Sequence, residues 1–333
     1  MGAELGRHWG ALVVFGLAAL TPLLVRDAYF LDSLVLILLW GALSAAWNVA
    51  GGYAGQVSLG HAAFFGIGAY SAAVLTVHWS LSPWIGLGLG MALSVVAGLV
   101  IGYLSNRLRG PYFVLATIAF AQVLLIAASR WREMTMGSEG IPVPFKQGFW
   151  TLGLASKVSW LYLTLAFALV LYLVQVYLEV SRMGYQLAGV REDEDAAQAL
   201  GIPGRRLKVI AIAMSAALTS AGGTFWAQYV GFVDPFYVFS IDLSVLFALN
   251  AIIGGAGTAL GPFLGSILIT SLEHYLRATL SDIAPGLIGV HLIIYGCLLI
   301  VMVRFVPQGL IGALGALFIR RARTARGERL ART

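Results

Sequence analysis

The residues that could carry out chemistry are few and lie far apart along the chain. The five histidines are scattered and the single cysteine is Cys297, so neither a clustered metal site nor an internal disulfide is expected. No HExxH or GxSxG pattern occurs. No lysine follows a glycine anywhere, which excludes a P-loop of the GxxxxGKS or GxxxxGKT kind. The sequence therefore predicts a chain that is not an enzyme and that holds no metal or cofactor of its own.

A group of polar side chains lies within or beside long apolar stretches: Asn48, Gln56, Ser58, His61, Gln122, Gln228 and Asn250. A polar group is costly in lipid, so each should face protein or water. Taken singly, each is interpreted as an interhelical hydrogen-bonding residue. As a group, they mark the candidate side of a translocation path. His61 is interpreted as a satisfied polar residue and not as a metal ligand.

The stretch "GVREDEDAAQALGIPGRRLK", residues 189–208, concentrates charge in a chain of which only 11% is charged. It holds four consecutive acids: Glu192, Asp193, Glu194 and Asp195. In the first turn of a short helix they would interact favourably with the helix dipole, by about 0.3–1 kcal/mol each. Gly201 would end that helix, and Pro203 would prevent its continuation. The alternatives are a docking element for a partner and a solvated acidic loop.

The elements that must position these residues are membrane spans. The chain is 59% hydrophobic, and residues 33–106 contain no Asp, Glu, Lys or Arg. Uncharged windows predict about ten spans, at residues 9–25, 33–50, 61–79, 84–106, 111–129, 158–178, 209–233, 243–253, 262–272 and 283–303. The first is interpreted as a retained span, not a signal peptide. The eighth and ninth are short, so they should use flanking polar residues or belong to broken helices.

The basic residues predict the orientation. With a cytoplasmic N-terminus and ten crossings, most of the 21 Lys and Arg residues fall on the cytoplasmic side, as does the C-terminus. The pI of about 9.5 then reflects topology and contact with membrane lipid, and no nucleic-acid partner is expected. We predict one transmembrane domain at residues 1–306 and a basic cytoplasmic tail at residues 307–333.

Two glycine-rich breaks interrupt the apolar sequence: "GGYAGQVSLGHAAFFGIGAY" from Gly51 and "GGAGTALGPFLGS" from Gly254. Glycines at this density let helices approach closely, or let the backbone leave helical geometry inside protein. Interrupted segments in both halves of a membrane protein indicate a translocation path.

Several spaced motifs resemble one known family. "DAAQALG", residues 195–201, is similar to the EAA-plus-Gly loop of ATP-binding-cassette importer permeases. Both glycine-rich breaks, "RLRGPYFVLATIAFAQV", "GSEGI" and "VDPFYVFSIDLS" resemble the LivM-type permeases of branched-chain amino acid importers. The resemblance runs from about residue 33 to residue 309.

The resemblance implies an all-α permease of the type II-like importer class in the bacterial inner membrane. Its implied partners are a second, LivH-type permease, two cytoplasmic ATP-binding subunits and a periplasmic substrate-binding protein. ATP and Mg would be bound by the ATP-binding subunits. The implied coupling residues are those of the acidic stretch: Arg191, Glu192, Asp193, Glu194, Asp195, Ala196, Ala197, Leu200 and Gly201. Glu139 and Asp234 are candidate contacts for the binding protein.

Other functions stay open at this point. The same architecture also imports urea, short amides or aromatic and other carboxylates. A standalone secondary carrier or channel is the alternative from another class. A carrier would more often place a carboxylate in mid-membrane. Here every Asp and Glu lies near a predicted span end.

Overall fold

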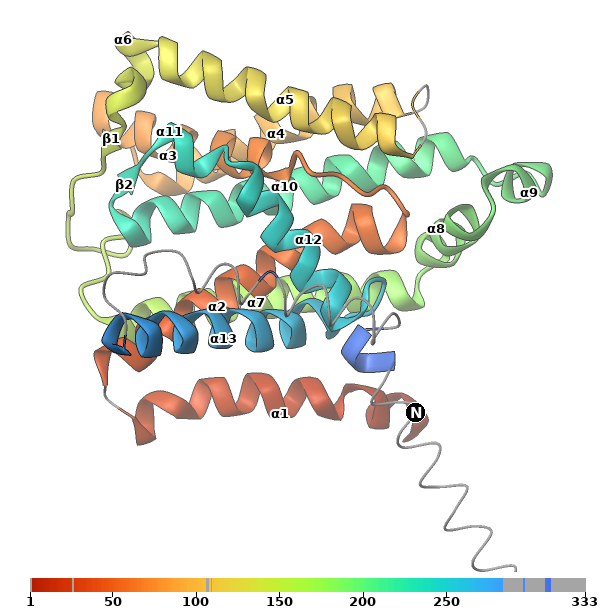
Figure 1. Ribbon diagram of the computed structural model, residues 1–333, viewed down its shortest axis with the longest axis horizontal. Coiled ribbons are helices and arrows are strands. Elements are labelled where there is room, and N and C mark those ends of the chain that lie inside the picture. Colours follow the sequence, from red (N-terminus) through yellow and green to blue (C-terminus); the bar gives the residue numbers. More distant parts are fainter. Residues whose placement is uncertain are drawn as a thin grey trace, which may run out of the picture.

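The computed structural model describes residues 2–25, 27–105, 108, 110–283, 296 and 309–312. Most of its long helices run along one common axis (Figure 1). These helices are α1 (Gly2–Leu24), α2 (Ala28–Asn48), α3 (His61–Trp79), α4 (Pro83–Ser105), α5 (Pro111–Arg130), α7 (Lys157–Val180), α10 (Gly204–Val230), α12 (Ile241–Gly255) and α13 (Gly261–Ile283). Seven stretches are long and apolar enough to cross a membrane: Ala28–Tyr53, His61–Trp79, Pro83–Leu104, Pro111–Arg130, Lys157–Val180, Gly204–Val230 and Pro235–Gly255. The predicted all-α multi-pass architecture is confirmed for the described part of the chain.

The predicted windows agree with these helices to different degrees. The third window, residues 61–79, has the bounds of α3. The eighth is longer than predicted, because short helix α11 (Pro235–Val238) extends the apolar stretch to Pro235–Gly255. The ninth continues past Glu273 as α13, although α13 is not among the seven apolar stretches. The tenth window lies almost wholly outside the described residues, as does most of the predicted tail.

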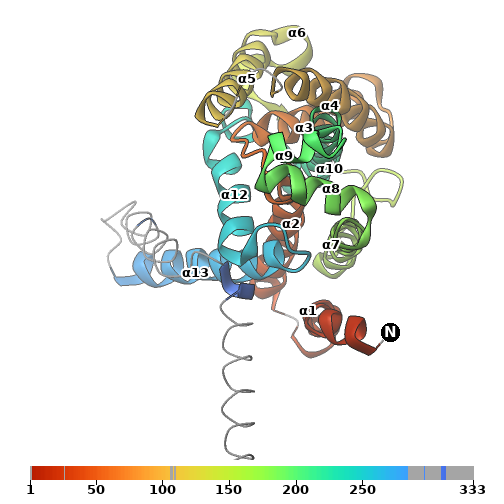
Figure 2. The same cartoon turned by 90° about the vertical axis from the view of Figure 1, so that its right-hand side faces the viewer.

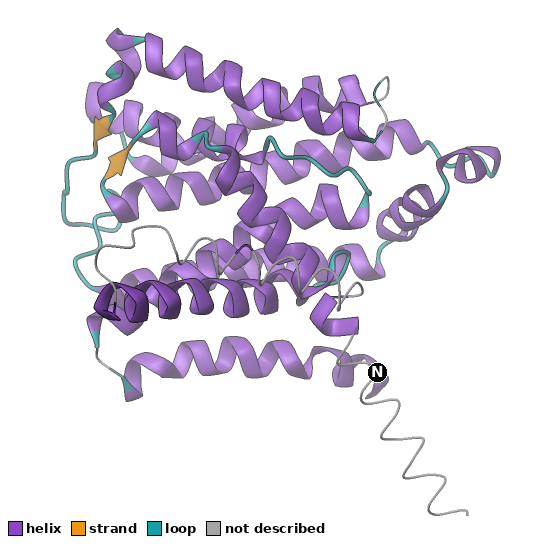
Figure 3. Cartoon of the chain, viewed as in Figure 1, coloured by secondary structure: helices purple, strands orange, loops and turns teal. Residues whose placement is uncertain are grey.

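The two ends of the bundle carry different small elements (Figure 3). One end, called the strand end here, holds α6 (Arg132–Thr135), η2 (Gly137–Glu139) and the strands β1 (Ile141–Pro142) and β2 (Phe232–Val233). The strands pair antiparallel, with Ile141 opposite Val233 and Pro142 opposite Phe232. The opposite end, called the α9 end, holds α8 (Arg182–Glu192) and α9 (Glu194–Ala199), which project beyond the long helices (Figure 1).

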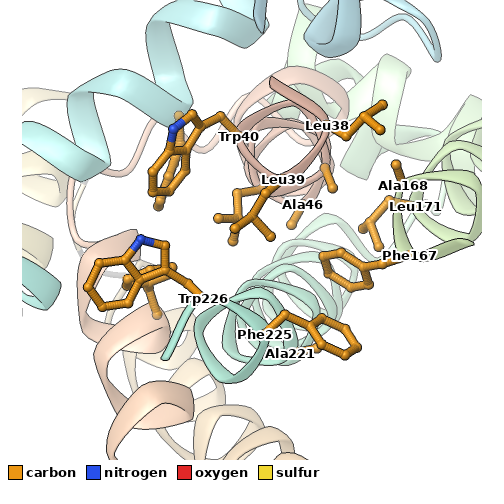
Figure 4. Close-up of a cluster of buried hydrophobic side chains, with 14 of the residues drawn as sticks. Leu38, Leu39, Trp40, Ala46, Phe167, Ala168, Leu171, Ala221, Phe225 and Trp226 are labelled. Carbon is orange, nitrogen blue, oxygen red and sulfur yellow. The ribbon is translucent and has the colours of Figure 1, made fainter. Parts of the chain in front are cut away.

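Helix α2 lies at the centre of the bundle. Seen from the α9 end, α7, α10, α12 and α13 surround it, whereas α1 lies at the edge (Figure 2). Large side chains fill the space between α2, α7 and α10 (Figure 4). Phe167 and Phe225 meet edge to face with their ring centroids 5.0 Å apart. This packed centre supports the broken helices that form the candidate site.

Candidate functional site

The first glycine-rich break ends α2 in a π-helical turn, η1 (Val49–Tyr53). Gly52 is required there, because a Cβ at this position would lie 1.8 Å from Asn48 Oδ1. The chain then runs back along the bundle as a non-helical segment, residues 54–60, before α3 begins (Figure 3). We call residues 54–60 the re-entrant segment. A π-helical turn inside a spanning helix often marks a functional position.

Hydrogen bonds hold the re-entrant segment inside the bundle. The Trp47 indole Nε1 donates to the Ser58 carbonyl over 2.7 Å. The Leu59 amide donates to Thr117 Oγ1 of α5 over 3.2 Å. Backbone that leaves helical geometry at membrane depth must be satisfied by protein in this way.

His61, the first residue of α3, is fully buried between two hydroxyl groups. Ser215 Oγ donates its only proton to the Ala46 carbonyl over 2.7 Å. His61 Nε2, 2.7 Å from Ser215 Oγ, must therefore be the donor. His61 Nδ1 lies 3.2 Å from Ser58 Oγ, within hydrogen-bonding distance. This arrangement gives both ring nitrogens a partner at the start of α3, as expected for a satisfied polar residue.

The second break lies directly against the first. It comprises the end of α12, the turn at residues 256–260 and the start of α13. Asn48 Oδ1 accepts from the Gly257 amide over 2.8 Å, and Asn48 Nδ2 donates to the Thr258 carbonyl over 3.1 Å. A single buried amide thus joins both glycine-rich breaks.

Two residues of α7 complete this cluster. Buried Gln175 accepts from Asn48 Nδ2 over 2.9 Å and donates to the Ala45 carbonyl over 2.5 Å. Glu179 Oε1 accepts from the Ala259 amide over 2.7 Å. Neither residue is among the predicted site residues. A glutamine in the apolar run "LYLVQVYLEV" was the available signal for Gln175, because a polar group there needs a buried partner.

The other predicted path residues do not join this cluster. Gln56 is half-buried in the re-entrant segment, and Gln122 is half-buried on α5. In the described part of the chain, both amide atoms of buried Asn250 and Nε2 of Gln228 lack a hydrogen-bond partner. The predicted set therefore divides into four residues at or beside the first break, Asn48, Gln56, Ser58 and His61, and three residues elsewhere, Gln122, Gln228 and Asn250.

A cavity of about 700 Å³ opens near the α9 end beneath the re-entrant segment. Its wall includes residues 54–57 and the start of α5, where Phe113 and Leu115 contribute apolar surface. Charged residues of the acidic stretch and α10 complete the lining: Arg191, Glu194 and Lys208. The cavity thus connects the first break with the predicted coupling residues.

The acidic stretch forms two helices instead of one. Glu192 ends α8, and Asp193 caps α9, its Oδ1 accepting from the amides of Asp195 and Ala196 over 3.0 and 2.9 Å. Only Glu194 and Asp195 lie in the first turn of α9. The predicted single helix start is therefore wrong, because the Asp193 side chain satisfies the free amides and begins a new helix.

Gly201 has the left-handed backbone that the sequence predicts, with φ of +83°. Leu200 beside it is 83% exposed, the largest exposed fraction among the large apolar residues that the structure describes. Ala197, in contrast, is buried at 4% exposure, so other residues of this chain cover it.

Two polar links fasten α8 and α9 to the long helices. Lys208 Nζ of α10 lies 2.6 Å from Glu194 Oε2, and both side chains are mostly buried. Arg191 Nη1 donates to the Gly52 carbonyl of η1 over 2.8 Å. Movement of the α8–α9 element would therefore act directly on α10 and on the first break.

At the strand end, Glu139 is exposed at the end of η2. Asp234 accepts from the Phe236 amide over 2.9 Å and so caps α11. Pairing of β1 with β2 brings their two loops to the same end of the molecule.

Comparison with known proteins agrees with this arrangement. The family model described as "Branched-chain amino acid transport system / permease component" matches residues 29–303. The chain is 29% identical to the high-affinity branched-chain amino acid transport system permease protein LivM of Escherichia coli K12, over 84% of this chain and 69% of that protein.

More distant relatives include a probable branched-chain amino acid transport permease protein LivM of Methanocaldococcus jannaschii, 23% identical over 84% of this chain and 94% of that one. The autoinducer 2 import system permease protein LsrC of Yersinia enterocolitica is 23% identical over 66% of this chain and 63% of its own length. No solved structure matches the chain. Because the family model covers most of the sequence, including both glycine-rich breaks and the acidic stretch, the chain belongs to the family of branched-chain amino acid transport system permease components.

Proposed function

We propose that this chain is the permease subunit of an ATP-binding-cassette importer that carries branched-chain or other hydrophobic amino acids across the inner membrane. The observation that carries the proposal is the α8–α9 element. It projects from one end of an apolar helical bundle, exposes Leu200 among acidic residues and is linked inward to the first glycine break. The names of three relatives, all LivM permease proteins of branched-chain amino acid transport, support the amino acid substrate.

ATP is bound and hydrolysed, with Mg, by two separate cytoplasmic subunits, and this chain carries no cofactor. Its contribution is mechanical. The ATP-binding subunits dock on an exposed surface of this element, formed by Glu192, Asp193, Asp195, Ala196 and Leu200. Their closure moves α8 and α9, and the links through Arg191 and Lys208 pass that movement to η1 and α10.

The path runs past the re-entrant segment to the cavity near the α9 end. Residues 54–57 and the start of α5 form one wall of that cavity. Its mainly apolar lining suits hydrophobic side chains. The backbone groups freed by the two breaks offer hydrogen-bonding sites to an ammonium or a carboxylate.

The α9 end faces the cytoplasm in this proposal, with both termini, and the strand end faces a periplasmic binding protein. Glu139 and Asp234 are the charges offered to that protein. A second, LivH-type permease completes the membrane part of this type II-like importer. The chain crosses ten times if residues 283–303 form the last span.

The test is reconstitution in lipid vesicles with and without the partner subunits. Uptake of radiolabelled leucine should require the second permease, the ATP-binding subunits, the binding protein and ATP together. Uptake by this chain alone would contradict the proposal in favour of a carrier or channel. Uptake of urea, short amides or aromatic carboxylates, but not of leucine, would support the importer architecture and contradict the proposed amino acid substrate.

A further inference from the structure

One residue of the acidic stretch, Arg191, makes a hydrogen bond into the first glycine-rich break. Arg191 lies in the last turn of α8, two residues before the cap of α9. Its side chain is only 37% exposed. Nη1 donates to the Gly52 carbonyl over 2.8 Å, 139 positions away in the sequence. Arg191 therefore joins the start of α9 to the broken end of α2.

Glycines of both breaks make room for this side chain. A Cβ on Gly55 would lie 2.8 Å from Arg191 Cγ, and one on Gly257 would lie 2.6 Å from Arg191 Nη1. Both glycines also have positive φ, of +67° and +77°, which other residues rarely adopt. The arginine side chain passes between the two breaks, through a space that a side chain at position 55 or 257 would enter.

The positive charge of Arg191 favours both groups to which its guanidinium donates, the Gly52 carbonyl and the Glu192 carboxylate. The Gly52 carbonyl belongs to the C-terminal end of a helix, where the dipole favours a cation. Nη2 donates to Glu192 Oε1 over 3.1 Å, so the guanidinium is also held by the α8–α9 element itself. A planar guanidinium can make both bonds at once in a fixed geometry, which a lysine ammonium cannot reproduce.

Building on the proposed function, we infer that Arg191 is a positioning residue that transmits movement of α8 and α9 to the two glycine breaks. It is not a contact for the ATP-binding subunits. Beyond Gly52, the movement reaches the turn at residues 256–260 through Asn48, which binds Gly257 and Thr258. One arginine thus connects the docking surface with both interruptions of the path.

The experiment compares Arg191→Gln and Arg191→Lys in the assembled transporter with Arg182→Gln. Arg182 is a matched control, since it is an exposed arginine in the first turn of the same helix. Three quantities are measured: copurification of the ATP-binding subunits, ATP hydrolysis, and leucine taken up per ATP hydrolysed. A fourth is independent of substrate. It is the maleimide labelling rate of Val57→Cys, an exposed wall residue of the cavity, in a Cys297→Ser background with and without ATP and vanadate.

Arg191→Gln should assemble and hydrolyse ATP, but uptake per ATP should fall about tenfold, the loss expected when a charge-assisted hydrogen bond is removed. Labelling at Val57→Cys should lose its response to ATP and vanadate. Arg191→Lys should be intermediate, and Arg182→Gln should behave like wild type.

Normal uptake per ATP and a normal labelling response in Arg191→Gln would overturn the inference. So would loss of the ATP-binding subunits from Arg191→Gln alone, since Arg191 would then be a docking residue. If the wild-type transporter fails to take up leucine, the substrate proposal fails, while the labelling response still decides the role of Arg191.

Discussion

Exposure separates the residues of α9 that can touch a partner from those that cannot. Leu200 is 83% exposed, whereas Ala197, three residues earlier, is 4% exposed and packs inward. The sequence pattern treats the small residues of "DAAQALG" alike, because a single short helix gives no sign of which face meets the bundle. A large side chain at Ala197 would disturb the fold of the element, so Leu200 is the position that tests docking.

Leu200→Asp should abolish substrate-stimulated ATP hydrolysis in the assembled transporter. Placing an unpaired carboxylate in an apolar groove costs about 3 kcal/mol or more, which corresponds to a loss of roughly a hundredfold in docking affinity. The measurement is ATP hydrolysis in vesicles together with the amount of ATP-binding subunit that copurifies. Leu200→Met is the matched control, because it keeps the size and the apolar character. Equal hydrolysis by both variants would show that the α9 end is a solvated loop.

At the scale of elements, seven apolar spans and the two breaks were predictable, but the contact between the breaks was not. Apolar runs and glycine clusters are local signals, and they place α3 and η1 correctly. Asn48 meets Gln175 and Thr258, which are 127 and 210 positions away. Hydrophobic periodicity in the sequence does not indicate contacts between residues so far apart, since those contacts depend on how the helices pack. For the same reason, the sequence does not predict the contact of Arg191 with Gly52, although Arg191 itself is one of the predicted coupling residues.

Asn48→Ala should loosen the connection between the two breaks. The change leaves the Gly257 amide, the Thr258 carbonyl and Gln175 without their partner, and each unsatisfied buried group costs about 1–3 kcal/mol. We expect a lower midpoint of thermal unfolding in detergent and reduced leucine uptake. Gln122→Ala is the matched control, because this half-buried amide is not part of the cluster. An unchanged midpoint for Asn48→Ala would mean that the breaks are held together by packing alone.

The whole molecule has two unlike ends, and the proposed function assigns a different role to each. The strand end is made of short strands and turns held by backbone pairing, which suits a stable surface for a binding protein. The α9 end is helical and is fastened to the bundle by side chains, which suits a part that moves. Substrate recognition and energy input are therefore expected on opposite faces of the membrane.

This separation predicts which positions react from each side of the membrane. Gln198 lies on α9 and Gln147 lies in the loop at the strand end, and both are exposed. In a Cys297→Ser background, Gln147→Cys should react with an impermeant maleimide added to intact cells. Gln198→Cys should react only after the cytoplasmic face is opened, because the positive-inside rule places the arginines around α9 in the cytoplasm. Ala42→Cys, at a fully buried position of α2, should stay unlabelled under both conditions and serves as the control. Labelling of both exposed positions from the same side would contradict the bundle orientation and, with it, the assignment of α9 to the ATP-binding subunits.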